Sequence, residues 1–178
     1  MVTRLAEHKG LDLVMEAFDE MMKEDIYFIL LGSGEEKYER FFNVATARYP
    51  GRVGAITKFS AELSSLIYAG ADLFLMPSLF EPCGLAQMIA AKYGTIPIVR
   101  STGGLHDSII PYNPEEKTGN GVTFLTIHPE DMLHAIKRAI GLYDNKKDWN
   151  QIVENAMNSD FSWNKGAKEY LKIYKDII

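Results

Sequence analysis

Five short runs of apolar residues recur along the chain, and longer stretches with a helical spacing of apolar residues separate them. The runs are Tyr27–Leu31, Val53–Ile56, Leu73–Met76, Ile96–Val99 and Gly121–Leu125. Runs this short and this continuously apolar are typical of strands that are covered on both faces. Val2 and Thr3 could form the end of a further strand.

The stretches between these runs predict helices. The first places Leu11, Val14, Phe18, Met21 and Met22 on one face and acidic residues elsewhere. Further helices are expected at Glu35–Arg48, Ala61–Tyr68, Gly84–Lys92, Leu105–Ile110, Pro129–Tyr143, Asp148–Met157 and Trp163–Ile178. Strands and helices that alternate at this spacing predict βαβ units with right-handed crossovers. The expected fold is therefore α/β, a Rossmann-like open parallel sheet with helices on both faces.

Composition narrows the class of protein. A chain of 178 residues fits a single domain, 1–178, and segment 111–121 (PYNPEEKTGNG) is expected to be a surface loop inside it. A net charge of -5 without a run of Lys or Arg argues against a nucleic-acid partner. No apolar run is long enough to cross a membrane, and no signal peptide is expected before the fold. The lone cysteine, Cys83, excludes an internal disulfide and suits a cytoplasmic setting.

Ligands of open α/β sheets bind beyond the carboxyl ends of the strands, so the residues after each apolar run are the first candidates for a site. Arg4 and Lys9 follow Val2 and Thr3 and precede the first helix. Two cations beside helix N–H groups are able to bind a phosphate. The alternative is that both are ordinary solvated side chains, which is the more frequent outcome for such a pair.

The segment Gly32-Ser33-Gly34 follows the first run and resembles the beginning of a dinucleotide-binding fingerprint. Lys37 stands where the third glycine of that fingerprint belongs. A tight turn between a strand and a helix is therefore the favoured interpretation.

Glu81 follows the run Leu73–Met76 and lies just before the helix expected at Gly84. A carboxylate at this position either caps the helix or serves as a functional acid, and the residues alone leave both open. Cys83 is not expected to be a nucleophile, because no histidine partner suggests itself. A buried small hydrophobe is the usual state of a free cysteine.

Paired glycines follow the run Ile96–Val99, in the segment Thr102, Gly103, Gly104 and Leu105. Glycines that open a helix let backbone N–H groups approach an anion closely. A plain glycine turn is the other interpretation of this segment.

Three further observations argue against other sites. The four histidines have no metal-ligand spacing, and neither HExxH nor CxxC occurs, so no metal is expected. No GxxxxGK[ST] segment is present, which argues against P-loop ATP hydrolysis. Trp163, Tyr170 and Tyr174 form an aromatic stripe on the last helix, which is expected to pack rather than to bind a ligand.

Three segments, taken together and in order, resemble one family. They are RLAEHKGLDLV, YAGADLFLMPSLFEPCGLAQMIAAKYGTIPIVRSTGGLHDSI and DFSW. They resemble the C-terminal lobe of the glycogen and starch synthases that use ADP-glucose, and the resemblance covers nearly the whole chain. FEPCGL followed by KYGTIPIVRSTGGL is the specific part, because looser sugar-nucleotide transferases share only a generic E-x-x-G-L core.

The resemblance implies the C-terminal lobe of a two-lobed GT-B fold. The N-terminal lobe and its KTGGL-type donor loop are missing from this chain. The implied reaction is transfer of glucose from ADP-glucose to the non-reducing end of an α-1,4-glucan. The configuration of the glucose is retained, which is usually explained by attack of the acceptor hydroxyl from the same face. The expected location is the cytoplasm, or the plastid in a plant. No cofactor or metal is expected, and the 178-residue lobe alone is expected to be inactive.

The resemblance also implies roles by matched position. Arg4 and Lys9 bind the donor diphosphate, Glu81 contacts the donor glucose, and Phe59 stands where relatives carry an aromatic residue that stacks on adenine. The other donor-binding positions are Cys83, Gly84 and Leu85 at the sugar, and Thr102, Gly103, Gly104 and Leu105 at the phosphates. These roles fit a leaving diphosphate stabilised by cations and N–H groups. They also fit an oxocarbenium-like sugar beside a carboxylate. Many relatives have arginine at the position of Leu79, so acceptor contacts or loop packing are expected to differ here.

Two alternatives remain open from the sequence. One is another GT-B glycosyltransferase that uses a UDP-sugar. The other is a non-catalytic module that binds a nucleotide or a glucan, although such a module has no need of Glu81 in FEPCGL.

Overall fold

The computed structural model describes residues 1–177, and its strands are all parallel to their neighbours. The strands are β1 (Phe28–Leu31), β2 (Val53–Ile56), β3 (Leu73–Met76), β4 (Ile96–Arg100) and β5 (Val122–Phe124). β1 pairs with β2, and β3, β4 and β5 form a second ladder in that order. The five strands coincide with the five predicted runs to within one residue at each end.

Helices follow the strands in the expected alternation. They are the 3₁₀ turn η1 (Glu7–Lys9), α1 (Leu11–Met21), α2 (Glu36–Arg48), α3 (Ala61–Gly70), α4 (Ala86–Lys92), α5 (Gly103–Ser108), α6 (Pro129–Asp144), α7 (Lys146–Asn158) and α8 (Trp163–Ile177). α1 forms where it does because its apolar positions recur every three or four residues and turn inward. Leu11, Val14, Phe18 and Met21 are all buried.

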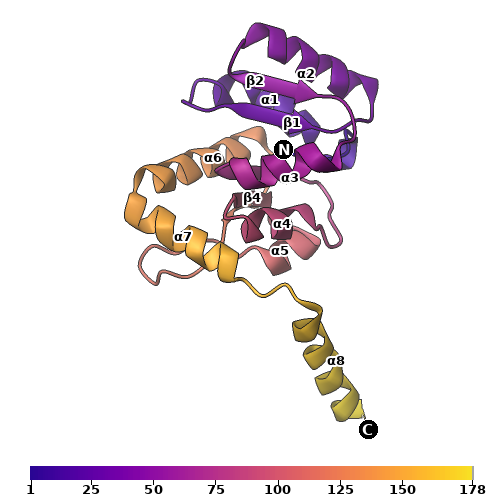
Figure 1. Ribbon diagram of the computed structural model, residues 1–178, viewed down its shortest axis with the longest axis vertical. Coiled ribbons are helices and arrows are strands. Elements are labelled where there is room, and N and C mark those ends of the chain that lie inside the picture. The colour runs from indigo at the N-terminus through magenta and orange to yellow at the C-terminus, as the bar shows by residue number, and fades with distance from the viewer. Residues whose placement is uncertain (178) are drawn as a thin grey trace.

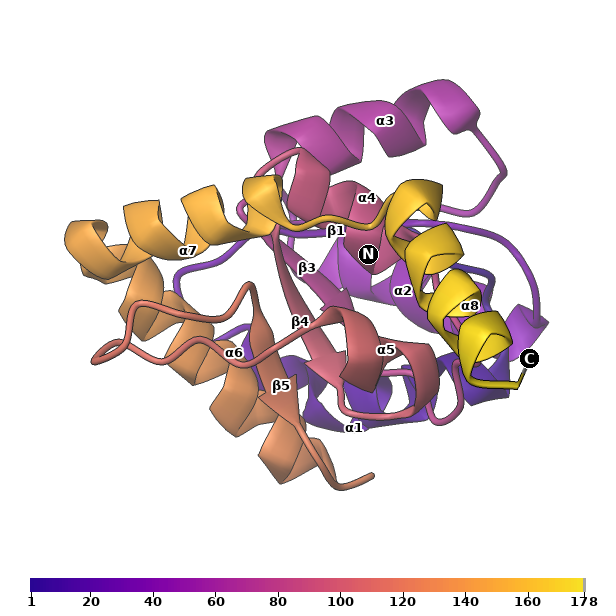
Figure 2. The ribbon, with the colours of Figure 1, turned by 90° about the horizontal axis from the view of Figure 1, so that it is seen from below.

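The strands lie in the middle, with helices on both sides, as predicted. Figure 2 shows α3 on one side of the strands and α1 and α6 on the other. The larger core lies on the α1, α2 and α6 side, where Phe18 packs edge-on against Phe28 and Phe42. Tyr68 and Phe74 pack together in the smaller core beneath α3 and α4. The candidate site is therefore built on strands held from both faces.

The predicted single sheet is interrupted between β1 and β3. Val2 forms an isolated parallel bridge to Leu31, and no strand of residues 1–177 joins β1 to β3. The two ladders nevertheless share one core, to which Phe28 of β1 and Ile98 of β4 both contribute. Parallel pairing and helices on both faces are as expected, whereas the continuous hydrogen-bonded sheet is not.

The predicted bounds of three helices need correction. α4 begins at Ala86 instead of Gly84, because Gly84 has a φ of +73°, outside the helical region. α5 begins at Gly103 and ends before the predicted Ile110. α7 begins at Lys146, two residues before the predicted start, because the Asn145 side chain caps it by accepting from the Asp148 amide.

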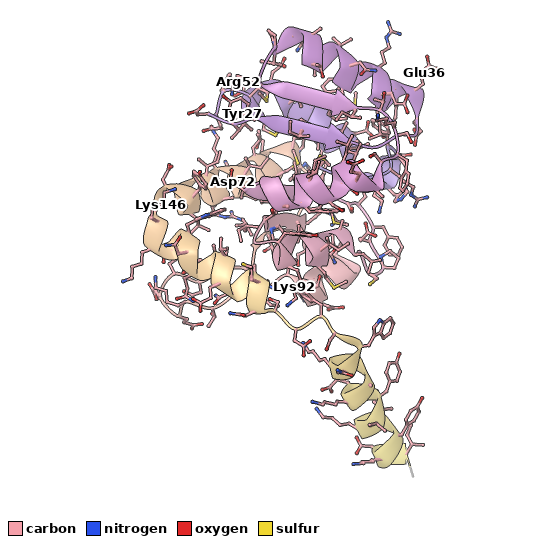
Figure 3. All side chains as sticks on the ribbon, viewed as in Figure 1. Tyr27, Glu36, Arg52, Asp72, Lys92 and Lys146 are labelled. Carbon is pink, nitrogen blue, oxygen red and sulfur yellow. The ribbon has the colours of Figure 1, made fainter. Side chains whose placement is uncertain are left out.

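The last helix, α8, extends away from the rest of the protein (Figure 1). Its aromatic stripe, predicted to pack, is exposed instead: Trp163, Tyr170 and Tyr174 are 92%, 62% and 56% accessible. Figure 3 shows α8 and its side chains projecting away from the other elements. The predicted helix end, Ile178, lies outside the described residues. Within residues 1–177, no helix is long and apolar enough to cross a membrane.

Candidate functional site

The turn η1 and the loop after β3 are joined at the carboxyl ends of the strands. The Leu79 amide donates to the His8 carbonyl at 2.8 Å. Gly10 ends η1 with a φ of +71°, and a Cβ atom there would lie 1.9 Å from the Pro77 carbonyl oxygen. Only glycine therefore allows this approach, which fixes Lys9 next to the loop that carries Glu81.

The Lys9 ammonium group forms an ion pair with Glu81, with 2.6 Å between Nζ and Oε2. The side chains are only 14% and 11% exposed. The Ser78 hydroxyl donates to the same carboxylate oxygen at 3.1 Å. Removal of either member of this sheltered pair would leave the other as an uncompensated charge, which destabilises the fold.

The backbone of Glu81 is held by the start of α5. The Gly104 amide donates to the Glu81 carbonyl at 3.0 Å. Gly103 has a φ of +47°, and a Cβ atom there would lie 2.3 Å from that carbonyl oxygen. The Glu81 side chain does not cap α4, since its partners are Lys9 and Ser78. The geometry thus excludes the helix cap, one of the two interpretations left open by the sequence, and the functional carboxylate stays a prediction.

Three polar residues that support this loop were not singled out from the sequence: Ser78, Gln87 and Arg100. The Arg100 guanidinium donates to the Ser78 carbonyl at 2.9 Å and to the Leu79 carbonyl. The buried Gln87 amide donates to the Cys83 and Gly84 carbonyls, both at 3.0 Å. Ser78 follows β3 and Arg100 ends β4, so the rule about carboxyl ends of strands could have found them.

The residues expected to bind the donor near the sugar are Cys83, Gly84 and Leu85, and they differ in exposure. Cys83 is exposed, which corrects the expected buried thiol. It lines an open pocket of about 580 Å³ together with Gly104 and Lys165. Leu85 is exposed as well. The loop is thus accessible to a ligand in this pocket.

The start of α5 presents fewer free N–H groups than its sequence suggests. The Gly104 amide donates to Glu81, and the Leu105 amide donates to the Thr102 carbonyl at 3.0 Å. The Leu105 side chain is fully buried in a small core. Two of the amides expected to face a phosphate are therefore already hydrogen-bonded within the protein.

Arg4 and Phe59 lie at a second pocket of about 200 Å³ at the same end of the strands. Phe59 is 89% exposed on the loop between β2 and α3, whose N-terminus is capped by Ser60. Ser33 and Lys58 are among its other polar lining residues. The pocket sets an aromatic ring beside cationic side chains, a combination that suits a base next to a phosphate.

No group of three or more His, Cys, Asp or Glu side chains among residues 1–177 is placed to hold a metal ion. The candidate site therefore consists of the Lys9–Glu81 pair, the loops that hold it and the Arg4–Phe59 pocket.

The family model described as "Glycosyl transferases group 1" matches residues 1–159. The chain belongs to this family. Its fold is the C-terminal lobe of a GT-B enzyme, as the resemblance implied, and the residues of the Lys9–Glu81 pair fall within the matched segment.

More specific relatives are glycogen and starch synthases. The chain is 49% identical to the glycogen synthase of Kosmotoga olearia and 52% identical to that of Bacillus cereus, over all 178 residues. It spans 38% and 37% of those proteins. The catalytic domain of starch synthase IV from Arabidopsis thaliana, bound to ADP and acarbose, superposes with a TM-score of 0.87 at 37% identity. That match covers 98% of this chain and 37% of the other.

Proposed function

We propose that the longer protein to which this lobe belongs is a glycogen or starch synthase. It transfers glucose from ADP-glucose to the non-reducing end of an α-1,4-glucan, with retention of configuration. The observation that carries this proposal is the sheltered Lys9–Glu81 ion pair at the carboxyl ends of the strands. Two relatives named glycogen synthase, identical to this chain at about half of its positions, support the same assignment.

The charges of the site match the two sides of the bond that breaks. ADP leaves with increasing negative charge, and Arg4 and Lys9 supply positive charge for its diphosphate. The glucose ring becomes oxocarbenium-like, and the Glu81 carboxylate supplies the negative charge that stabilises it. No metal is needed in this scheme, because the two side chains provide the cations.

Lys9 has two anionic partners in this scheme. Its ammonium group lies 2.6 Å from Glu81. We expect the donor diphosphate to share the ammonium group when it binds. The ammonium group then interacts less strongly with the Glu81 carboxylate, and this carboxylate becomes available to the sugar.

The pocket of Arg4 and Phe59 is proposed as the seat of the adenosine. Phe59 offers an exposed ring for stacking, and Arg4 lies where the diphosphate leads from the base toward Lys9. The relative of known structure that contains ADP supports an adenine nucleotide. The Cys83–Leu85 loop and the Gly103 region are proposed to surround the glucose and the phosphates.

The rest of the longer protein is proposed to supply the acceptor site and the second wall of the cleft. Orientation of two substrates accounts for about 7–11 kcal/mol of a barrier. Without that wall, the 178-residue chain is expected to bind nucleotide weakly and to transfer no glucose.

The test is incorporation of labelled glucose into glycogen by the full-length protein, with ADP-glucose and UDP-glucose compared side by side. The proposal predicts incorporation from ADP-glucose, and none by the 178-residue chain alone. Transfer mainly from UDP-glucose would instead identify another glycosyltransferase. Absence of transfer from either donor, together with tight nucleotide binding, would identify a binding module.

A further inference from the structure

The side chain of Gln87, in the first turn of α4, is bonded to the loop that is proposed to surround the glucose. It is fully buried, and its Nε2 group donates to the Cys83 and Gly84 carbonyl oxygens, both at 3.0 Å. The same group donates to the Ser108 hydroxyl at 3.1 Å, on the neighbouring helix α5 (Figure 1). One amide group thus holds two successive carbonyls of the loop and joins them to α5.

The orientation of the Gln87 amide follows from its partners. The Cys83 and Gly84 carbonyls are acceptors only, so the amide presents its NH₂ group to both. The Ser108 hydroxyl donates to the Gly104 carbonyl at 2.6 Å, and it therefore accepts from Gln87. Gln87 Oε1 is left without a hydrogen-bond partner among residues 1–177. A buried oxygen without a partner costs free energy that an apolar side chain would not, so the hold on the loop accounts for the amide better than core stability does.

The two held carbonyls set the direction of the next two amide groups. In a trans peptide the C=O and N–H bonds point to opposite sides, and no peptide bond of the described residues is cis. The Gly84 and Leu85 N–H groups therefore point away from Gln87. Neither N–H group has an acceptor within residues 1–177, and Leu85 is exposed. Both groups are thus available to the hydroxyl oxygens of a bound sugar.

The Gln87 amide is also joined to the backbone of Glu81. The Ser108 hydroxyl is bonded both to this amide and to the Gly104 carbonyl. The Gly104 amide in turn donates to the Glu81 carbonyl at 3.0 Å. One chain of hydrogen bonds therefore holds the sugar-side loop together with the residue whose carboxylate is proposed to face the sugar.

We infer that Gln87 is a positioning residue for the transfer of glucose, an inference that rests on the proposed function. By holding two carbonyls of the loop, it directs the Gly84 and Leu85 N–H groups toward the hydroxyl groups of the donor sugar. Ser108 keeps the Gln87 amide in the orientation that this requires. Gln87 does not line the pocket proposed for the adenosine, so its effect is expected on the sugar and not on the nucleotide.

The experiment compares Gln87→Met with Gln151→Met in the full-length protein. Methionine keeps the length of the side chain but cannot donate, and Gln151 is the matched control because its amide donates to Asn155 within α7. Gln87→Met is expected to lower kcat/KM for ADP-glucose by at least about 10-fold, since small displacements of positioned groups are costly. The dissociation constant for ADP, which has no sugar, should stay unchanged. Equal kcat/KM of the two variants, or an equal loss of ADP affinity in Gln87→Met, would overturn the inference.

Ser108→Ala tests the second member of this arrangement and serves if Gln87→Met folds poorly. It removes a partner of the Gln87 amide, so kcat/KM should fall in the same direction by a smaller factor. The double variant should lose no more than Gln87→Met alone, because the two residues act as one unit. Losses that add in the double variant would contradict this shared role.

The order parameters of the Gly84 and Leu85 amides, from NMR relaxation of the 178-residue chain, test the hold on the loop without any donor. They are expected to fall from about 0.85, typical of rigid backbone, toward about 0.6 in Gln87→Met, and to stay unchanged in Gln151→Met. Equal order parameters in the two variants would overturn the inference. Failure of the unaltered full-length protein to transfer glucose from ADP-glucose would instead overturn the proposed function, and the order parameters distinguish the two failures.

Discussion

The Lys9 ammonium group and the Glu81 carboxylate lie 2.6 Å apart, although 72 residues separate them in the sequence. Two backbone contacts bring them together: the Leu79 amide on the His8 carbonyl, and the close approach of Gly10 to Pro77. The two charges thus compensate one another, and the proposed function assigns the cation to the leaving diphosphate and the anion to the sugar. Several predictions about nucleotide binding depend on this pairing.

Lys9→Ala and Glu81→Gln are expected to change the affinity of the chain for ADP in opposite directions. Lys9→Ala removes a charged donor and leaves Glu81 unpaired, so the dissociation constant should rise by about 10-fold or more. Glu81→Gln keeps the shape and frees the ammonium group for the diphosphate, so the constant should fall. Isothermal titration calorimetry measures both.

Lys23→Ala is the matched control for these variants, because Lys23 pairs with Glu20 on the surface, outside the candidate site. Its affinity for ADP should equal that of the unaltered chain. If Lys9→Ala binds ADP as well as Lys23→Ala does, the role of Lys9 is wrong.

Phe59→Ala is expected to weaken ADP binding by about 1–3 kcal/mol, the size of one base–aromatic stacking contact. Phe59→Tyr keeps the ring and should bind nearly as well as the unaltered chain. Tyr27→Ala removes an exposed ring remote from the Arg4–Phe59 pocket and serves as the control. If the same calorimetry gave equal affinities for Phe59→Ala and Tyr27→Ala, the assignment of adenine to this pocket would be wrong.

Gly10→Ala is expected to destabilise the chain by more than about 2 kcal/mol, since its φ is positive and its Cβ atom would overlap the Pro77 carbonyl. Gly141→Ala tests the opposite case. A Cβ atom there meets nothing within 4 Å in the last turn of α6, so stability should rise, by up to about 0.5–1 kcal/mol. Urea unfolding compares the two. A Gly10→Ala chain as stable as the unaltered one would show that η1 is not held against the β3 loop.

The stability of the chain is expected to depend on pH through the amino group of Met1. Its pKa is about 5 when folded and 8.0 when unfolded, because burial disfavours the charged form. Between pH 8 and 5 the unfolded chain therefore binds more protons, so the free energy of unfolding falls as the pH falls, by up to about 1.4 kcal/mol per unit. Acetylation of the amino group should remove this component of the slope. Parallel slopes for the acetylated and free forms, from urea unfolding at several pH values, would contradict it.

Much of the fold could be predicted from local sequence. Val53–Ile56 and Leu73–Met76 are strands with the predicted bounds, because short apolar runs between helical stretches have few other outcomes. The break between β1 and β3 could not be predicted in this way, since it depends on which strand edges meet. The apolar stripe of α8 is a different case: such a stripe indicates a partner, and the exposure of Trp163 fits an exposed patch of the kind that marks an interface.

The candidate site was predicted as a set of residue types more than as an arrangement. Glu81 and Lys9 were expected near a sugar and a diphosphate, but their mutual ion pair arises from tertiary contacts. A tertiary contact also occupies the Gly104 amide, which donates to the Glu81 carbonyl. From the glycine pattern alone, this amide was expected to face a phosphate. Cys83 is exposed for a related reason, because it lies on a loop whose carbonyl is held from inside by Gln87.

The most direct test of the account is the turnover of Glu81→Gln in the full-length protein, with ADP-glucose as donor and glycogen as acceptor. The account assigns Glu81 to the stabilisation of the sugar's developing positive charge, so kcat should fall by about 100-fold or more. ADP should still bind the variant at least as tightly as before, because Lys9 is then free for the diphosphate. A kcat close to that of the unaltered enzyme would contradict the assignment and leave the Lys9–Glu81 pair as a structural contact.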